Sequence, residues 1–490
     1  MSSPTSANSM GDGVAVSPLR EMLSIAGPTV ATMVSYTLMT FTDKWICAQI
    51  GPEPIYVGAQ GNGGLMAWVP ISLAHGFLNV ISTFASQNMG AGKADRGPAY
   101  AWNGLYLGLA YWLAVLLPIS FALPMIFGAS SMDPRQAEMA TQYGQILLWG
   151  AGITMVVRSL GQFFFGLHRP GVMLAAGVTS NVFNLVISAV LTFGAVAPET
   201  LGAFGKFTAW IAQLFGMREG MGIAGSAIGT VLATMIEAAV PACIFLGKKM
   251  HEKYGTRTSW RFSMSHAREI FQMGWPAGLM FANEMVCWAF FMVYLVSHFG
   301  AEHATAGWIA HQYMSLSFMP AVGLSVAASA LVGKYQGMRR SDIAEARAWL
   351  AVKLALVYMG VCAIVFFVFR EQLIRTFVRE DTPADQIERL VKLGSGFLIA
   401  TAAFQLFDAV AMTLSGALRG AGDTKVPGVA TVLLSWTIIV GGGFFMVKLL
   451  PQLESLGPWI AAATYIAVLC LFLLGRFLKG RWRDIRVVRD

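Results

Sequence analysis

The amino-acid sequence predicts an all-α integral membrane protein with twelve transmembrane helices, arranged as two six-helix bundles that are related by a pseudo-two-fold axis along the membrane normal. Three observations predict this fold class. Apolar residues make up 56% of the 490-residue chain and charged residues only 12%, whereas about 25% of the residues in soluble proteins are charged. Long, nearly uncharged runs recur along the whole chain. Motifs of the first half return at a nearly constant spacing in the second half.

The apolar runs are long enough to cross a bilayer, whose hydrocarbon core requires about 20 residues of helix. We expect every span to be helical, because an open sheet leaves backbone hydrogen-bonding groups unpaired in lipid. The twelve predicted spans are residues 22–46, 61–85, 99–127, 140–165, 171–196, 222–247, 270–299, 304–332, 347–369, 388–416, 427–449 and 458–477.

These spans divide the chain into five predicted regions. Residues 1–17 are small and polar, and we expect a disordered cytoplasmic N-terminus there. Because no basic segment precedes the first apolar run, we expect no cleaved signal peptide. Residues 18–247 form the N-terminal six-helix bundle and residues 269–477 the C-terminal one. A basic cytoplasmic linker, residues 248–268, joins them, and residues 478–490 form a basic cytoplasmic tail.

The positions of lysine and arginine predict the orientation. Every second loop is basic, and the loops between are poorer in basic residues and often acidic, as at Arg379, Glu380 and Asp381. Cytoplasmic loops of membrane proteins carry such an excess of positive charge, so both termini are expected in the cytoplasm, and the protein is expected to span the plasma or inner membrane several times. The inner-loop residues are Lys93, Arg96, Arg169, Lys248, Lys249, Lys253, Arg257, Arg261, Arg268, Lys334, Arg339, Arg340, Arg347, Arg419 and Lys425.

The net charge of +8 therefore reports topology. A nucleic-acid-binding protein gathers its basic residues on one face, whereas these are dispersed among loops, and no nucleic-acid partner is predicted. The lipid bilayer is the expected surrounding, and the chain is expected to act as a monomer.

An internal repeat predicts how the two halves are related. The repeated residues are Gly90 and Gly337, Asp95 and Asp342, and Trp102 and Trp349 at a spacing of 247; Pro28 and Pro276 at 248; and Arg169 and Arg419 at 250. Each half holds six spans, and an even number gives both halves the same orientation. Parallel repeats of this kind suit alternating access, in which one bundle rocks against the other around a central site.

Cysteine and histidine residues do not form the groups that an enzyme requires. The five cysteines occur singly, without metal or redox spacing, and we interpret them as packing residues. The seven histidines are scattered and form no metal-ligand pair at helical spacing. We therefore expect neither an enzyme nor a cofactor, and a receptor is disfavoured because no sizeable soluble domain exists to carry its output.

Ionisable residues inside the spans are the candidate functional groups. A carboxylate at the bilayer centre costs about 2.5–3.5 kcal/mol or more, and such residues usually face the bundle interior and mark ion or substrate pathways. The acidic ones are Asp43, Glu237, Glu284 and Asp408. The basic Arg158 lies at a depth comparable to that of Glu237, and a structural salt bridge between these two is the favoured interpretation.

Glu284 and Asp408 are the deepest acids, about 21 Å and about 12–15 Å from the inner ends of their helices at 1.5 Å per residue. Asn283 and Trp288 flank Glu284 in an otherwise apolar run. A carboxylate in that setting is suited to hold a proton at neutral pH or to bind Na⁺ through its oxygens, and both couple ion flow to movement. Gln405 and Ser415 share the helix face of Asp408 and predict a polar cavity wall.

The first half carries a different acidic site. Asp43 lies near the outer end of the first span, with Tyr36 and Thr40 on the same helix face. The repeat places Tyr36, not Asp43, at the position of Glu284. The ion function is therefore not expected to be shared equally between the bundles. The 27 methionines and many aromatic residues include candidates for lining a cavity that takes lipophilic organic cations.

Several stretches resemble the multidrug and toxic compound extrusion (MATE) transporters, in particular their NorM-like branch. The most specific is FDAVAMTLSGALRGAGDTKVP, similar to the family's tenth helix and following loop. The others are GPTVATMVSYTLMTFTDKWICAQIG, ASQNMGAGKAD, RSLGQFFFGLHRPGVM, GWPAGLMFANEM and AHQYMSLSFMP. The similarity runs from about residue 18 to residue 475.

The resemblance implies an antiporter that expels organic cations or other drugs in exchange for Na⁺ or H⁺. The family's cation-site residues carry over to Glu284 and Asp408, and its first-helix aspartate to Asp43. Its fifth-helix asparagines would be Asn181 and Asn184. This chain departs from the family at Lys44, where a small hydroxyl residue is usual, and this lysine beside Asp43 weakens the case for an N-terminal cation site.

One alternative remains within the same wider superfamily, a flippase for lipid-linked oligosaccharides. Such a protein requires a large, strongly cationic cavity to hold phosphate groups, and few basic residues lie within the predicted spans. The sequence alone does not name the substrate or distinguish Na⁺ from H⁺.

Overall fold

The structure, a computed structural model, describes residues 17–51, 55–129, 132–376 and 384–488. Within them, twelve helical segments are long and apolar enough to cross a membrane, which confirms the predicted number of spans. The spans of the first half are α1 (Pro18–Ala48); α2 (Ile55–Leu78) with α3 (Val80–Gly90); α4 (Gly97–Tyr111) with η2 (Trp112–Leu116) and α5 (Leu117–Gly128); α6 (Pro134–Gly166); α7 (Pro170–Phe193); and α9 (Ile223–Phe245).

The second half repeats this order. Its spans are α11 (Met264–Phe290) with η4 (Phe291–Val296) and η5 (Ser297–Phe299); α12 (Ala301–Gly337); α13 (Ser341–Val368); α15 (Ala384–Ala421); α16 (Lys425–Leu434) with η6 (Ser435–Gly442) and α17 (Gly443–Leu449); and α18 (Leu456–Leu478). The short connecting helices are η1 (Ala94–Arg96), η3 (Glu199–Leu201), α8 (Gly202–Leu214), α10 (Lys248–Tyr254), α14 (Arg370–Arg375), η7 (Pro451–Leu453) and η8 (Arg481–Asp484).

Each predicted span overlaps one of these segments, and most helices extend beyond the predicted ends. Helical hydrogen bonding continues past the hydrocarbon region, which hydropathy alone does not register. The predicted N-terminal segment and the acidic stretch 379–381 lie outside the described residues. Ser17 is the exception, because its hydroxyl accepts a hydrogen bond of 3.3 Å from the Arg20 backbone N–H at the start of α1.

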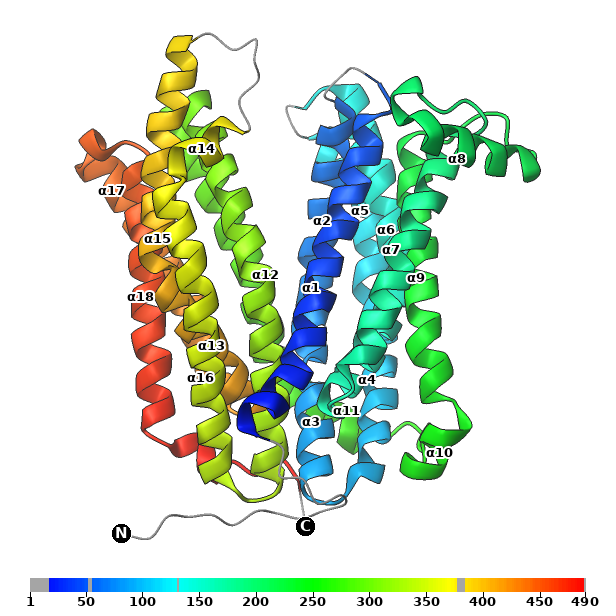
Figure 1. Ribbon diagram of the computed structural model, residues 1–490, viewed down its shortest axis with the longest axis vertical. Coiled ribbons are helices and arrows are strands. Elements are labelled where there is room, and N and C mark those ends of the chain that lie inside the picture. Colours follow the sequence, from blue (N-terminus) through cyan, green and yellow to red (C-terminus); the bar gives the residue numbers. More distant parts are fainter. Residues whose placement is uncertain (1–16, 52–54, 130–131, 377–383, 489–490) are drawn as a thin grey trace.

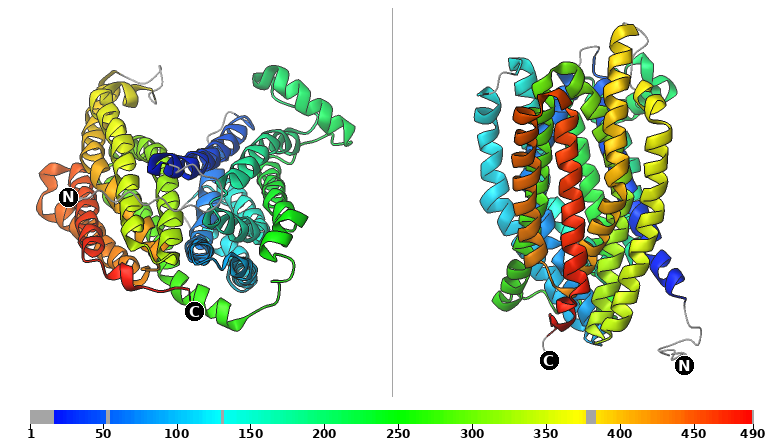
Figure 2. Two further views of the ribbon diagram at one scale, coloured as in Figure 1. Left: turned by 60° about the horizontal axis from the view of Figure 1, so that its bottom comes forward. Right: turned by 90° about the vertical axis from the view of Figure 1, so that its left-hand side faces the viewer.

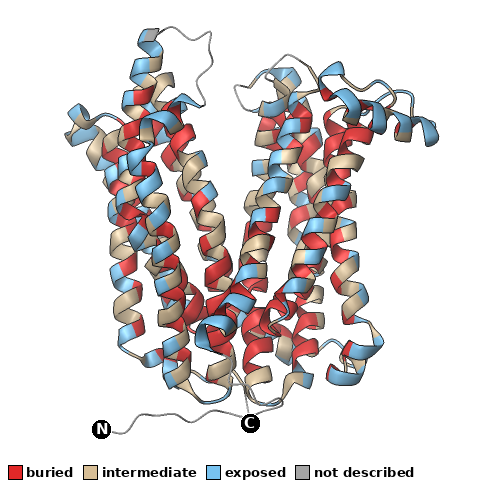
Figure 3. Cartoon of the chain, in the orientation of Figure 1, coloured by how far each residue is buried: buried red, intermediate tan, exposed pale blue. Residues whose placement is uncertain are grey.

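The two groups of helices meet at one end of the molecule and diverge toward the other (Figure 1). We call the meeting end, where α1 begins and α18 ends, the terminal end; it is the lower end in Figure 1. Across it, α1 and α3 pack against α12, and α2 packs against α11. Buried residues line the interior of each bundle and the region where the bundles meet (Figure 3).

A reciprocal contact at the terminal end relates the two bundles. A Cβ atom added to Gly90 would lie 1.9 Å from the Lys334 carbonyl oxygen, and one added to Gly337 would lie 2.0 Å from the Gln87 carbonyl oxygen. Gly337 is the repeat counterpart of Gly90, and Lys334 follows Gln87 by the same 247 residues. Each half therefore presents the same surface to the other, as a two-fold axis requires. Glycine is needed here because the helix backbones touch.

The connection between α7 and α9 contains α8, which runs sideways from the end opposite the termini (Figures 1 and 2). Its Gly205, Thr208 and Ala212 are buried, whereas Phe207 and Trp210 are exposed. The sequence analysis did not predict this helix, since its 13 residues are too few to span a bilayer.

Candidate functional site

Glu284 of α11 and Asp408 of α15 both lie in membrane spans of the C-terminal half. Both side chains are partly buried, and their charges are close enough to interact. Among the described residues, neither carboxylate has a hydrogen-bond or ion-pair partner. The Tyr465 hydroxyl of α18 is within electrostatic range of both, and sequence reasoning did not single it out. The two acids that the sequence analysis singled out therefore lie within electrostatic range of each other, and their shared role stays a prediction.

Asn283 fixes the helix that carries Glu284. Its Nδ2 donates to the Ser435 hydroxyl at 2.8 Å, and its Oδ1 accepts from the Trp436 indole at 2.7 Å. Both partners belong to η6, so buried Asn283 ties α11 to the eleventh span. Its neighbour Glu284, about 100° further around the helix, is left without such a partner. Trp288, one turn after Glu284, contacts His311 edge-on.

The predicted polar face of α15 divides into two parts. Gln405 is buried, and its Nε2 donates to the Ser317 hydroxyl of α12 at 2.8 Å, while its Oε1 has no partner in the described structure. Gln405 therefore ties α15 to α12 close to Asp408. Ser415 lies two turns beyond Asp408 and lines a separate small cavity with Arg419.

Asp43 of α1 is held by hydrogen bonds inside the N-terminal bundle. It is 5% exposed, and it accepts from Asn184 Nδ2 at 3.1 Å and from the Thr230 hydroxyl at 3.0 Å. Asn181 does not contact it, but donates to the Ser35 carbonyl at 2.7 Å. Lys44 is exposed and makes no ion pair with Asp43 among the described residues. Thr230 was not predicted, since a threonine in a distant helix carries no distinctive signal.

A second cluster in the N-terminal bundle joins Tyr36, Glu237 and Arg158. The Tyr36 hydroxyl donates to Glu237 Oε1 at 2.9 Å, and the Arg158 guanidinium lies 4.9 Å from the centre of the Tyr36 ring. The expected salt bridge between Arg158 and Glu237 is absent from the described ion pairs, because Tyr36 lies between them. Thr40 is exposed and donates to the Tyr36 carbonyl at 3.2 Å.

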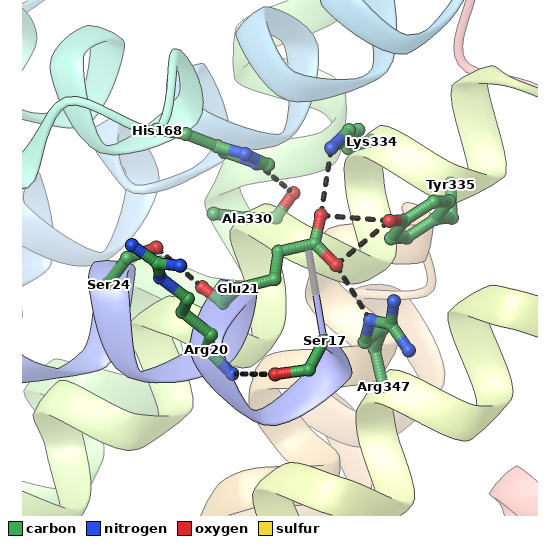
Figure 4. A network of polar contacts seen from close by, with 9 residues as sticks. All are labelled: Ser17, Arg20, Glu21, Ser24, His168, Ala330, Lys334, Tyr335 and Arg347. Atoms are coloured by element: carbon green, nitrogen blue, oxygen red, sulfur yellow. Dashed lines mark hydrogen bonds and ion pairs between the residues drawn. The ribbon is translucent and has the colours of Figure 1, made fainter. Parts of the chain in front are cut away.

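A polar network at the terminal end links the bundles (Figure 4). Glu21 of α1 accepts hydrogen bonds from Lys334 at 2.8 Å, from the Tyr335 hydroxyl at 2.8 Å and from Arg347 at 2.8 Å. The donors belong to α12 and α13. His168, between α6 and α7, contacts the Ala330 carbonyl of α12 at 3.0 Å. Sequence reasoning missed this network, because Glu21 lies at the edge of its span, where a charged residue is unremarkable.

No group of three or more His, Cys, Asp or Glu side chains gathers in the described residues as a metal ligand set. The five cysteines are free; Cys47, Cys287 and Cys470 are buried as packing residues would be, Cys362 is partly buried, and Cys243 is exposed. Two carboxylates alone are weak ligands for a transition metal, but oxygen ligands suit a proton or a hard cation such as Na⁺.

Comparison with known proteins gives one family. The MatE family model matches two stretches of the chain, residues 28–190 and 276–442, which begin at the repeat-related Pro28 and Pro276. A probable multidrug resistance protein NorM from Thermotoga maritima is 29% identical over 490 residues, covering 96% of this chain and 94% of that protein. A protein of the same description from Mesorhizobium japonicum is 26% identical over 469 residues, 94% of each chain.

Solved structures show the same fold. A crystal structure of MATE in complex with MaL6 has a TM-score of 0.82 at 19% identity, over 96% of this chain and 98% of that one. A MOP superfamily transporter from Pyrococcus furiosus also has a TM-score of 0.82 at 19% identity, over 96% and 97% of the two chains. At these identities the likeness defines the helix arrangement alone.

Proposed function

Because this chain belongs to the MatE family, we propose that it is a cation-coupled efflux antiporter that exports organic cations or other drugs across the cytoplasmic membrane. The names of its relatives, which are multidrug resistance proteins, support the substrate class. In this proposal Na⁺ or H⁺ enters through the protein as each substrate molecule leaves, the chain works as a monomer, and both termini are cytoplasmic.

The pair of carboxylates at Glu284 and Asp408 carries the proposal. Each is partly buried in a membrane span without a hydrogen-bond or ion-pair partner among the described residues. Two negative charges in that setting repel each other, and one proton or one Na⁺ relieves the repulsion. An organic cation relieves it equally well, so substrate and coupling ion compete for one site, as antiport requires.

The arrangement of the bundles supports alternating access. The contacts between α1 and α12 that join the halves involve residues 21–30 of α1, near the terminal end, and the helices diverge toward the other end (Figure 1). With the termini in the cytoplasm, this state faces outward. Rocking of one bundle against the other would separate Glu21 from its partners and open the site inward.

The testing experiment uses proteoliposomes and a fluorescent organic cation. We expect transport under an imposed Na⁺ gradient or an imposed pH gradient, and the effective gradient identifies the coupling ion. Glu284→Gln and Asp408→Asn should each lower gradient-driven transport by about tenfold or more, because each removes a charge that must bind the ion. Glu302→Gln is the control, since Glu302 lies in the first turn of α12 and its carboxylate is 40% exposed.

Two results would contradict the proposal. Full transport by Glu284→Gln under the normal gradient would show that coupling does not require the carboxylate pair. Absence of organic-cation transport under either gradient would instead favour the lipid-linked oligosaccharide flippase, or a MATE-like transporter whose substrate is not an organic cation.

A further inference from the structure

Arg419 is a buried charge without a partner. It lies near the end of α15 and is only 8% exposed. Among the described residues, its guanidinium makes no hydrogen bond and no ion pair. Arginine does not lose its proton in proteins, and an isolated charge in an apolar setting is costly unless something neutralises it. A group from outside the chain would offset that cost.

The guanidinium borders a small cavity that no described acid fills. The cavity measures about 10 Å³, which is close to the room that one water-sized sphere requires. Its lining residues, from α11, α15, α16 and the connection between the last two, are Ala277, Met280, Ser415, Arg419, Asp423, Thr424, Pro427 and Gly428. The one acid among them, Asp423, is already bound to Arg476 at 2.8 Å, so the cavity retains the positive charge of Arg419.

Two further features suit an anion. Ser415 lies one turn before Arg419 on α15, and its hydroxyl has no hydrogen-bond partner in the described structure. The first turn of the ten-residue helix α16 closes another side of the cavity, and the N-terminal end of a helix carries partial positive charge. A phosphate group is far too large for this space, and a chloride ion, which is larger than a water molecule, enters it only with a shift of the lining side chains.

We propose that this cavity is a halide site, in which chloride binds the Arg419 guanidinium and the Ser415 hydroxyl beside the first turn of α16. The site adjoins the contact between the bundles. Thr83 of α3 donates to the Arg419 carbonyl at 3.0 Å, and Gln87 of α3 donates to the Gly420 carbonyl at 2.9 Å. Bound chloride neutralises a charge next to these bonds and stabilises the state in which the bundles meet here.

The test measures thermal unfolding of the purified full-length chain in detergent, with chloride replaced by gluconate at constant Na⁺ concentration and ionic strength. Chloride should raise the unfolding midpoint saturably, by about 2 °C or more. Arg419→Gln should abolish this rise. Arg169→Gln is the matched control, because Arg169 is the repeat counterpart, is exposed, and contacts Met250 Sδ instead; it should retain the rise.

A second measurement covers the case in which Arg419→Gln does not fold. Crystals of the unmodified chain grown in bromide should show an anomalous peak within hydrogen-bonding distance of Arg419. The proposal is overturned if chloride and gluconate give the same midpoint, if Arg419→Gln keeps the chloride-dependent rise, if Arg169→Gln loses it as well, or if bromide binds only elsewhere. The first of these results would mean that water alone fills the cavity.

Discussion

At the scale of single residues, the buried acids differ in their partners. Asp43 and Glu237 accept hydrogen bonds from neighbouring helices, whereas Glu284 and Asp408 have no such donors among the described residues. A carboxylate that already accepts hydrogen bonds is stabilised less by binding a cation than a carboxylate that accepts none. This difference supports the coupling role proposed for the C-terminal pair and favours a structural role for the Tyr36 cluster.

The Tyr36 cluster allows a direct test of that structural role. Tyr36→Phe keeps the ring beneath Arg158 but removes the hydroxyl that donates to Glu237, a residue only 4% exposed. We expect a loss of about 1–3 kcal/mol of stability, because a buried carboxylate loses a donor. Chemical unfolding in mixed micelles measures this loss, and Tyr294→Phe, on a tyrosine that is 64% exposed, should change stability by less than about 0.5 kcal/mol. Equal stability of the two variants would contradict the structural role.

The two kinds of acid were not equally predictable from the sequence. Glu284 and Asp408 stand out because a charge inside an apolar run is rare and costly. The partners of Asp43 and Glu237 come from helices far away in the chain, and hydroxyl and amide residues such as Thr230 and Asn184 are too common in spans to be noticed. The expected pairing of Arg158 with Glu237 placed the right residues together, but the intervening Tyr36 ring depends on side-chain packing that no sequence pattern encodes.

At the scale of helices, hydropathy predicted the spans and their order, and the repeat predicted how the two halves are related. The close contact of α3 with α12 at Gly90 and Gly337 was not predicted, because a repeated glycine does not show which backbone it touches. The break between α2 and α3 at Asn79 and the π-helical turns of η2, η4 and η6 were not predicted. They depend on local hydrogen-bond shifts that change neither composition nor length.

The glycine contact gives a prediction at this scale. A methyl group at Gly90 or Gly337 would meet a carbonyl oxygen of the other bundle at 1.9 or 2.0 Å, so alanine at either position must push α3 and α12 apart. We expect Gly90→Ala and Gly337→Ala to lower the unfolding midpoint by several degrees, about 2–4 °C for each kcal/mol lost. Gly27→Ala, in α1 with no atom within 4 Å of the added methyl, should stabilise by up to about 1 kcal/mol through helix propensity. A Gly90→Ala variant as stable as Gly27→Ala would show that the backbones do not touch.

At the scale of the whole molecule, the proposed alternating access requires contacts that are present in only one of its two states. We infer that the Glu21 network is such a contact, since it joins α1 of one bundle to α12 and α13 of the other (Figure 4). The Glu21 side chain is 15% exposed and the Arg347 side chain is 12% exposed, so water screens the bonds between them only partly. They therefore contribute more than a surface ion pair does.

Removing that contact should change the populations of the two states. Glu21→Gln weakens charge-assisted hydrogen bonds to Lys334 and Arg347, which are worth about 1.5–3 kcal/mol each. The ratio of outward-facing to inward-facing molecules should therefore fall by about tenfold or more. Distances between spin labels on the two bundles at the end opposite the termini should shorten, while labels at the terminal end should move apart. Glu345→Gln is the matched control: Glu345 also carries an ion pair near the terminal end, to Arg483 at 2.6 Å, but both partners belong to the C-terminal half. Unchanged distances in Glu21→Gln, or an equal change in Glu345→Gln, would mean that these bonds hold local structure and do not set the direction in which the transporter faces.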